Sequence, residues 1–192
     1  DTAALERSLN EMVRRHETLR TTFERRDGQP VQVIQPKLLL SLAVTAVSED
    51  EVDAWREKIG RTPFNLSTDP PIRTHLLKLS DTEHILLITV HHIVSDGWTM
   101  TILFRELFTL YEAFAAGKPS PLPKLPIQYA DYARWQQEQM QGARWQQQLA
   151  YWSEQLGDAE YVLALPTKTR PAVQSSFGRK HTFTVPLALA NQ

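Results

Sequence analysis

The sequence contains no cysteine. Disulfides, thiol nucleophiles and cysteine-ligated zinc or iron–sulfur sites are therefore excluded. This absence fits a reducing compartment, so we expect a cytoplasmic protein. No apolar run approaches the roughly 20 residues that a membrane-spanning helix needs, and we expect no membrane partner. The first ten residues, DTAALERSLN, are too polar and charged to act as a secretory signal.

Charge of one sign is also lacking, because 21 Lys and Arg residues face 22 Asp and Glu residues. Proteins that bind nucleic acid usually carry a strong positive excess, so we expect no nucleic-acid partner. The 192 residues, 42% of them hydrophobic, suit one ordinary globular domain or two small ones. The chain does not begin with Met, and we expect it to be a piece of a longer chain.

An amphipathic helix is predicted at the start of the chain, where apolar positions recur every three or four residues. The stripe consists of Leu5, Leu9, Met12, His16, Leu19 and Phe23. Asp27-Gly28 then predicts a hairpin turn between strands at 21–26 and 30–34. A further strand is expected at 41–47.

Two more elements follow from local signals. Ser48 and Glu51 have the spacing of a capping box, which predicts a helix that runs to about Gly60. A second hairpin is expected from 72–80 and 84–92. Its second strand is apolar on both faces between Ile85 and Val90, which indicates a central strand covered on both sides.

Helices dominate the next part of the sequence. One is expected after Asp96-Gly97 and should end at Gly117 and Pro119. The proline-rich segment 118–126 predicts an extended connector. A long helical region at 127–157, broken near Gly142, follows. Its tryptophans are expected to belong to the core: Trp135, Trp145 and Trp152.

The chain is expected to close with a loop at 166–171 and a strand at 181–187. Helices and strands are intermixed, and the strands include hairpins. The sequence therefore predicts an α/β (α+β) fold with a mixed β-sheet flanked by helices.

Two adjacent histidines, His91 and His92, end the apolar strand and are followed by Asp96-Gly97. One interpretation is a polar strand end and a tight turn. The other is a general base, because neutral imidazole accepts a proton near physiological pH. Adjacent strand residues point to opposite faces, so only one histidine can face a cleft. Gly97 would permit a backbone conformation closed to other residues.

A metal site is the remaining possibility for the histidines, with His75, His84, His91 and His92 as candidate ligands. Neighbouring strand histidines diverge, and no carboxylate lies at ligand spacing. We therefore expect no metal. Packing or capping roles, with no part in catalysis, are expected for His16, Glu17, Tyr129 and Tyr132.

The heptad HHIVSDG at 91–97 resembles the H-H-x-x-x-D-G signature of the condensation domains of nonribosomal peptide synthetases, which have a chloramphenicol-acetyltransferase-like fold. RHETLRTTF at 15–23 and IQYADYARWQ at 127–136 are similar to the motifs that flank this signature in the family. YWSEQLGDAE at 151–160 and LALPTKTRP at 163–171 resemble the family's next stretch. The four matches occur in family order.

The resemblance implies that residues 1–187 form the N-terminal lobe of such a domain, without its first helix and strand. Residues 188–192 would begin the crossover into a C-terminal lobe. We expect an isolated fragment of this kind to be inactive.

The implied reaction is amide-bond formation between a donor acyl or peptidyl thioester and an acceptor aminoacyl thioester. Both substrates would be carried on the 4′-phosphopantetheine of carrier proteins, and no cofactor would be bound directly. The implied partners are the upstream and downstream peptidyl carrier domains and an adjacent adenylation domain.

His92 is the residue that the resemblance assigns to catalysis, either as a base or by positioning the amine. His91 would be structural and point away. Asp96 would also be structural, paired with an arginine of the RHETLR segment, for which Arg20 and Arg15 remain alternatives.

The resemblance further implies that Gly97 leaves room for substrate and places its amide near the oxyanion. Trp98 is typical of condensing members. A weaker likeness favours an L-configured donor and an L-configured acceptor. Two alternative functions stay open: a catalytically silent carrier-binding or recruitment module of the same fold, and an acyltransferase that uses free coenzyme A.

Overall fold

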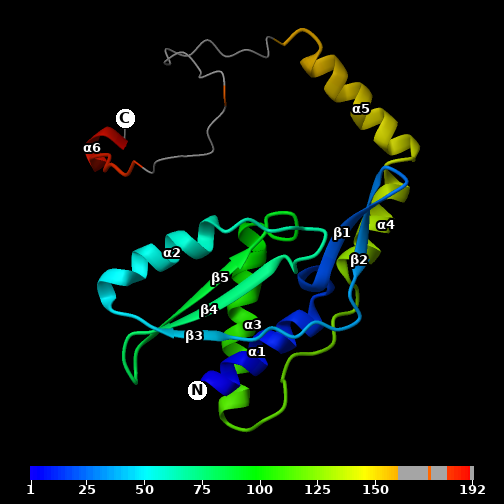
Figure 1. Cartoon of the computed structure of the whole chain (residues 1–192). Helices are drawn as coiled ribbons and strands as arrows, with labels where there is room; N and C mark the ends of the chain where they lie inside the picture. Colours follow the sequence, from blue (N-terminus) through cyan, green and yellow to red (C-terminus); the bar gives the residue numbers. More distant parts are fainter. Residues whose placement is uncertain (160–172, 174–180, 191–192) are drawn as a thin grey trace. The chain divides into compact units, whose positions relative to one another are not determined.

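The computed structural model describes residues 1–159, 173 and 181–190, and it divides the chain into two compact units, Asp1–Gly142 and Ala143–Gln192 (Figure 1). The first unit contains the β-sheet, a hairpin and most of the helices. The second contains α5, Ala143–Leu156, and α6, Leu187–Ala190.

A three-stranded mixed sheet forms the centre of the first unit. Its order is β3 (Ala43–Ala46), β4 (Ile72–Lys78) and β5 (His84–Val90), with β3 parallel and β5 antiparallel to β4. The predicted strands and the mixed sheet are confirmed. Within the described residues β5 pairs only with β4, so it is an edge strand and not the central strand that its apolar sequence indicated.

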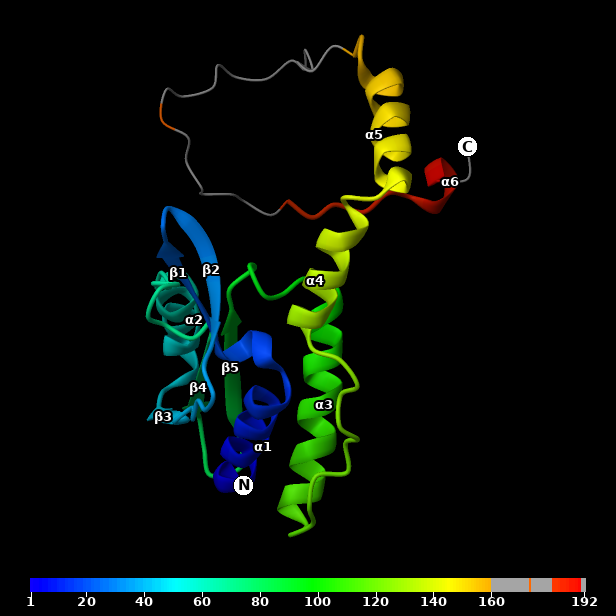
Figure 2. The same ribbon diagram turned by 90° about the vertical axis from the view of Figure 1, so that its right-hand side faces the viewer.

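Helices cover both faces of this sheet, which explains why β5 is apolar on both sides. The helices α1 (Thr2–Arg15) and α3 (Gly97–Ala115) lie side by side on one face, and α2 (Val52–Arg61) lies on the other (Figure 2). The larger core, toward α1 and α3, consists of Leu9, Met12, Val13, Leu19, Leu42, Ile72, Leu76, Leu103, Leu107 and Leu110. The smaller core, toward α2, consists of Val47, Val52 and Leu77.

The predicted first hairpin is confirmed. After a 3-10 turn, η1 (Glu17–Arg20), strand β1 (Thr21–Arg26) pairs antiparallel with β2 (Gln29–Ile34). The turn between them has positive φ angles of 52° at Asp27 and 78° at Gly28. A two-residue turn of this kind matches the right-handed twist of the strands, and residues such as Asp and Gly tolerate it.

The predicted helix signals after β3 and α3 are also confirmed. Ser48 and Glu51 form a capping box at η2 (Glu49–Glu51), which leads into α2. Beyond α3, Gly117 has a φ of 68°, as expected for a helix end. Residues 118–126 form no regular element before α4 (Tyr129–Gln139). The helix break near Gly142 is observed, since α5 starts at Ala143.

Two predictions for the last part of the chain are wrong. Residues 181–186 form no strand and lead into α6, because alternating sequence yields a strand only where a neighbouring strand supplies hydrogen bonds. The tryptophans are not core residues: Trp135 and Trp152 are more than half exposed. The predicted loop at 166–171 lies outside the described residues. None of the described helices is both long and apolar enough to cross a membrane.

Candidate active site

The two histidines of the signature lie just beyond β5, in a segment that we call the histidine loop, residues 91–96. Strand β5 ends at Val90, so the expected alternation of strand faces does not govern them. Instead both lie in a turn that is closed by the Val94 N–H, which donates to the His91 carbonyl at 3.1 Å. His91 is half-buried and His92 is exposed.

His91 has several contacts that hold it in this turn. Its N–H donates to the Pro71 carbonyl at 2.8 Å, and its Nδ1 accepts from the Ile93 N–H at 3.0 Å. Its ring stands edge-on to that of Phe64, with 5.7 Å between centroids. Because Nδ1 is an acceptor here, a neutral His91 carries its proton on Nε2. The geometry is that of a residue that braces the loop.

The His92 ring makes no hydrogen bond to the described residues, and it lies on the wall of a cavity of about 960 Å³. His16 and Tyr132 line the same cavity, together with Asp96 and Glu106. Residues that the sequence singled out for the site and residues to which it gave no catalytic role therefore line one cavity. The cavity belongs to the first unit and is formed by the ends of α1, α3 and α4 with the histidine loop.

Asp96 does not form the arginine pair expected from the sequence. Its Oδ1 accepts from the Thr99 N–H and from the Thr99 hydroxyl, both at 2.7 Å, and caps the N-terminus of α3. The hydrogen bonds from the Thr99 hydroxyl and N–H lower the pKa of Asp96, and the nearby His92 acts in the same direction. An exposed Asp before a helix finds donors in the first turn and needs no buried cation.

Both candidate arginines have other partners. Arg20 bonds Glu17 at 3.2 Å and also donates to the Gln35 carbonyl. Arg15 donates from Nε to Glu106 Oε2 at 3.0 Å, and from Nη1 to the Pro123 carbonyl. The expectation of an Asp96–Arg ion pair is therefore corrected.

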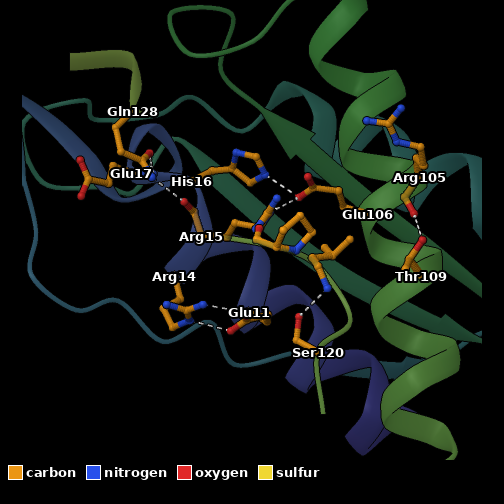
Figure 3. A network of polar contacts seen from close by, with 12 residues as sticks. Glu11, Arg14, Arg15, His16, Glu17, Arg105, Glu106, Thr109, Ser120 and Gln128 are labelled. Atoms are coloured by element: carbon orange, nitrogen blue, oxygen red, sulfur yellow. Dashed lines mark hydrogen bonds and ion pairs between the residues drawn. The ribbon is translucent and has the colours of Figure 1, made fainter. Parts of the chain in front are cut away.

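A buried network forms part of the cavity wall and was not expected from the sequence. We use the term buried network for Arg15, His16, Glu106 and Gln128, which Figure 3 shows at close range. Glu106 Oε2 contacts both Arg15 Nε and His16 Nε2, the latter at 2.7 Å. The side chains of Arg15 and Glu106 are only 8% and 7% exposed. The signal for this network was the position of Glu106 on the buried stripe of α3, between Leu103 and Leu110.

Gly97 and Trp98 begin α3. Gly97 has no positive φ, so the expected conformational reason for a glycine is wrong. A side chain added at Gly97 would meet open space, which is compatible with room for a ligand. Trp98 is 79% exposed. Among the described residues no cluster of three His, Asp or Glu side chains is placed to hold a metal ion.

Comparison with known proteins connects this site with a family. The model of the condensation domain matches residues 1–192. The chain is 47% identical over 194 residues to a linear gramicidin synthase of Brevibacillus parabrevis, covering 97% of this chain and 2% of that protein. It is 40% identical over 189 residues to chondramide synthase of Chondromyces crocatus, covering 95% and 5%.

Solved structures show the same fold. The X-domain from teicoplanin biosynthesis superposes with a TM-score of 0.83 at 35% identity, covering 90% of this chain and 40% of that one. The first condensation domain of the CDA synthetase gives a TM-score of 0.71 at 24% identity, covering 83% and 42%. The chain thus spans a small fraction of these curated relatives and about two fifths of these solved structures. With its whole length matched by the family model, the chain belongs to the condensation-domain family.

Proposed function

We propose that this chain is the N-terminal lobe of an enzyme that forms amide bonds in nonribosomal peptide synthesis. The observation that carries the proposal is the family match over residues 1–192, together with an intact His92 on the wall of a cavity. In the proposed reaction, the amine of an acceptor aminoacyl thioester attacks the carbonyl of a donor thioester. A C–N bond forms, the C–S bond breaks, and the proton lost by nitrogen balances the departing thiolate.

In this reaction His92 takes the proton from the attacking amine or orients it. Its role is supported by its exposure on the cavity wall and by a ring that makes no hydrogen bond to the described residues. An imidazole that is neutral near pH 7 suits this task. His91 and Asp96 have structural roles, since one braces the histidine loop and the other caps α3. Gly97 leaves space for the ligand, and Trp98 flanks it.

The substrates and partners follow from the same proposal. The donor and acceptor are carried on the 4′-phosphopantetheine of upstream and downstream carrier domains, next to an adenylation domain, in the cytoplasm. Residues 1–187 belong to the N-terminal lobe and 188–192 begin the crossover. Solved relatives of greater length support a second lobe, because this chain covers about two fifths of them.

The test is a condensation assay on this chain within a full-length two-lobed domain. Both carriers would be loaded, and the acceptor would be followed by intact-protein mass spectrometry. We expect product from the parent and a fall of about 10²- to 10⁴-fold for His92→Ala. His91→Ala, checked for folding, is the matched control. Product that survives His92→Ala at the parent rate would contradict the site assignment, and acyl transfer from free coenzyme A thioesters at a matching rate would favour the simpler acyltransferase.

A recruitment module is the second candidate, and one comparison favours it. The chain superposes with a TM-score of 0.84 on a structure described as the complex of the X-domain and OxyB from teicoplanin biosynthesis. The retained His92, Asp96 and Gly97 support the enzyme instead. Carriers that bind the parent domain while no amide forms would decide for recruitment.

A further inference from the structure

The cavity that contains His92 has a second imidazole on its wall, that of His16. His16 is the C-cap residue that follows α1, and its backbone is extended, with φ −103° and ψ 102°. Its side chain is 18% exposed. It is therefore a half-buried group that still reaches the cavity surface, which is the usual setting of a side chain that contacts a ligand.

Glu106 fixes the His16 ring from behind. The distance from His16 Nε2 to Glu106 Oε2 is 2.7 Å, and Arg15 Nε lies 3.0 Å from the same oxygen (Figure 3). Arg15 already supplies the counter-charge of this buried carboxylate. A neutral His16 is thus sufficient for the contact, and it donates its Nε2–H to Glu106. A carboxylate that orients an imidazole in one tautomer is the arrangement that prepares histidines for chemistry or binding.

The backbone on either side of His16 is fixed as well. Gln128 donates from Nε2 to the Arg15 carbonyl at 3.0 Å and accepts the Glu17 N–H at 3.2 Å. Gln128 is also the N-cap residue of α4, and its N–H donates to Asp131 Oδ2 at 2.9 Å. One side chain therefore holds both neighbours of His16. The ring's position is set by α1, α3 and α4 together, which leaves it little freedom to move.

His92, by contrast, makes no hydrogen bond to the described residues. In His16, Nε2 contacts Glu106, whereas Nδ1 makes no hydrogen bond to the described part of the chain. In the neutral ring this Nδ1 is a lone-pair acceptor. Among ligands in the cavity it would select an N–H donor. Glu106 uses a single oxygen, Oε2, for its contacts with both Arg15 and His16.

We propose that His16 is a substrate-binding residue whose Nδ1 accepts a hydrogen bond from the acceptor amine and orients it beside His92. This inference rests on the proposed function and adds a residue that contacts the acceptor. His16 undergoes no covalent step. Arg15 and Glu106 act through it as positioning residues.

The decisive variant is His16→Gln. A glutamine amide nitrogen can replace Nε2 as the donor to Glu106, but it offers no lone pair at the position of Nδ1. His75→Gln is the matched control, because His75 Nε2 bonds Thr45 Oγ1 at 2.9 Å on a sheet strand outside the cavity. The assay would use the full-length two-lobed domain, a loaded donor carrier and a soluble aminoacyl-pantetheine acceptor at varied concentration.

We expect His16→Gln to lower kcat/KM for the acceptor by about 10- to 100-fold, the size expected for one hydrogen bond to a charged or ionising group, while the KM of the donor is unchanged. The control should match the parent. An active parent with an unaffected His16→Gln would overturn the inference and leave the proposed function intact. An inactive parent would overturn the proposed function itself.

A second measurement covers the case in which His16→Gln fails to fold. Long-range ¹H–¹⁵N NMR on the parent chain at neutral pH reports which nitrogen of each histidine carries the proton. We expect a proton on Nε2 and none on Nδ1 of His16. A proton on Nδ1 would remove the acceptor and overturn the inference without any variant.

Discussion

The two sides of the cavity are built in opposite ways. The histidine loop is partly exposed, and the exposed His92 ring makes no hydrogen bond to the described residues. In the buried network on the other side, one Glu106 oxygen contacts both Arg15 and His16, and Gln128 donates to the Arg15 carbonyl (Figure 3). The HHIVSDG motif lies on the first side, whereas the RHETLRTTF and IQYADYARWQ segments supply Arg15, His16 and Gln128 to the second. A loop with few side-chain hydrogen bonds therefore faces a densely hydrogen-bonded network across one cavity.

This comparison is tested most strongly by Glu106→Ala. The substitution would leave the Arg15 guanidinium buried without its partner, and we expect the free energy of unfolding to fall by about 3–5 kcal/mol. Urea denaturation measures the loss. The matched control is Glu11→Ala, which breaks the partly exposed Glu11–Arg14 pair and should cost under about 1 kcal/mol.

Equal costs for the two variants would contradict the distinction between a buried and an exposed pair. The double variant Arg15→Met with Glu106→Leu sharpens the test. Because it removes both charges and fills the space with apolar groups, it should recover most of the stability lost by Glu106→Ala.

Gln128→Ala is expected to have the next largest effect. It removes the hydrogen bonds at 3.0 and 3.2 Å that hold the backbone around His16, which should cost about 1–3 kcal/mol. Gln136→Ala, on the exposed face of the same helix, should change stability by no more than about 0.5 kcal/mol. Thermal unfolding of both variants measures this difference. A Gln128→Ala protein as stable as the control would contradict the role of Gln128 in holding the backbone around His16.

The adjacent histidines should differ from each other on a smaller scale. His91→Ala removes the acceptor of the Ile93 N–H and the contact with Phe64, and we expect a loss of about 1 kcal/mol. His92→Ala should stay within about 0.5 kcal/mol of the parent, since the ring is exposed. Chemical denaturation under one set of conditions compares them. A larger loss for His92→Ala would show that the exposed wall carries stability after all.

The smallest expected effect is a pH dependence from Asp96. The Thr99 hydrogen bonds lower its pKa in the folded chain below the ordinary value of 3.8. The carboxylate therefore contributes stability above pH 3.8 that is lost as the pH falls through the folded pKa. Urea midpoints measured from about pH 5 to about pH 2 should fall less steeply for Asp96→Asn than for the parent. Parallel curves would contradict the assigned shift.

The two compact units differ in a related way. In the first unit the apolar residues of α1 and α3 are buried together, as their periodicity predicted. In the second, the equally periodic α5 leaves Leu149 and Trp152 at least half exposed within the described residues. Periodicity reports which side of a helix is apolar, and burial additionally needs a surface that covers it.

Much of the fold was predictable from local signals. The Asp27-Gly28 turn, the Ser48 capping box and the end of α3 just before Gly117 all appear where the sequence indicated. Each depends on the conformational preferences of a few neighbouring residues. The strand expected at 181–187 failed because its hydrogen bonds would have to come from a distant partner.

The same distinction between local signals and distant contacts applies to the candidate site. The family resemblance and the candidate residues His91, His92 and Asp96 were visible as a short motif, because the spacing of side chains within one loop is written directly in the sequence. Which charges pair was not visible there. Arg15 and Glu106 are 91 positions apart, and they meet only because α1 and α3 pack side by side. The sequence suggested Asp96 as the partner of an arginine, but Thr99 lies three residues away and satisfies it locally. Motifs and turns therefore come from neighbouring residues, whereas the choice of buried partners follows from helix packing, since a buried ion pair requires side chains that the packed elements bring within hydrogen-bond distance.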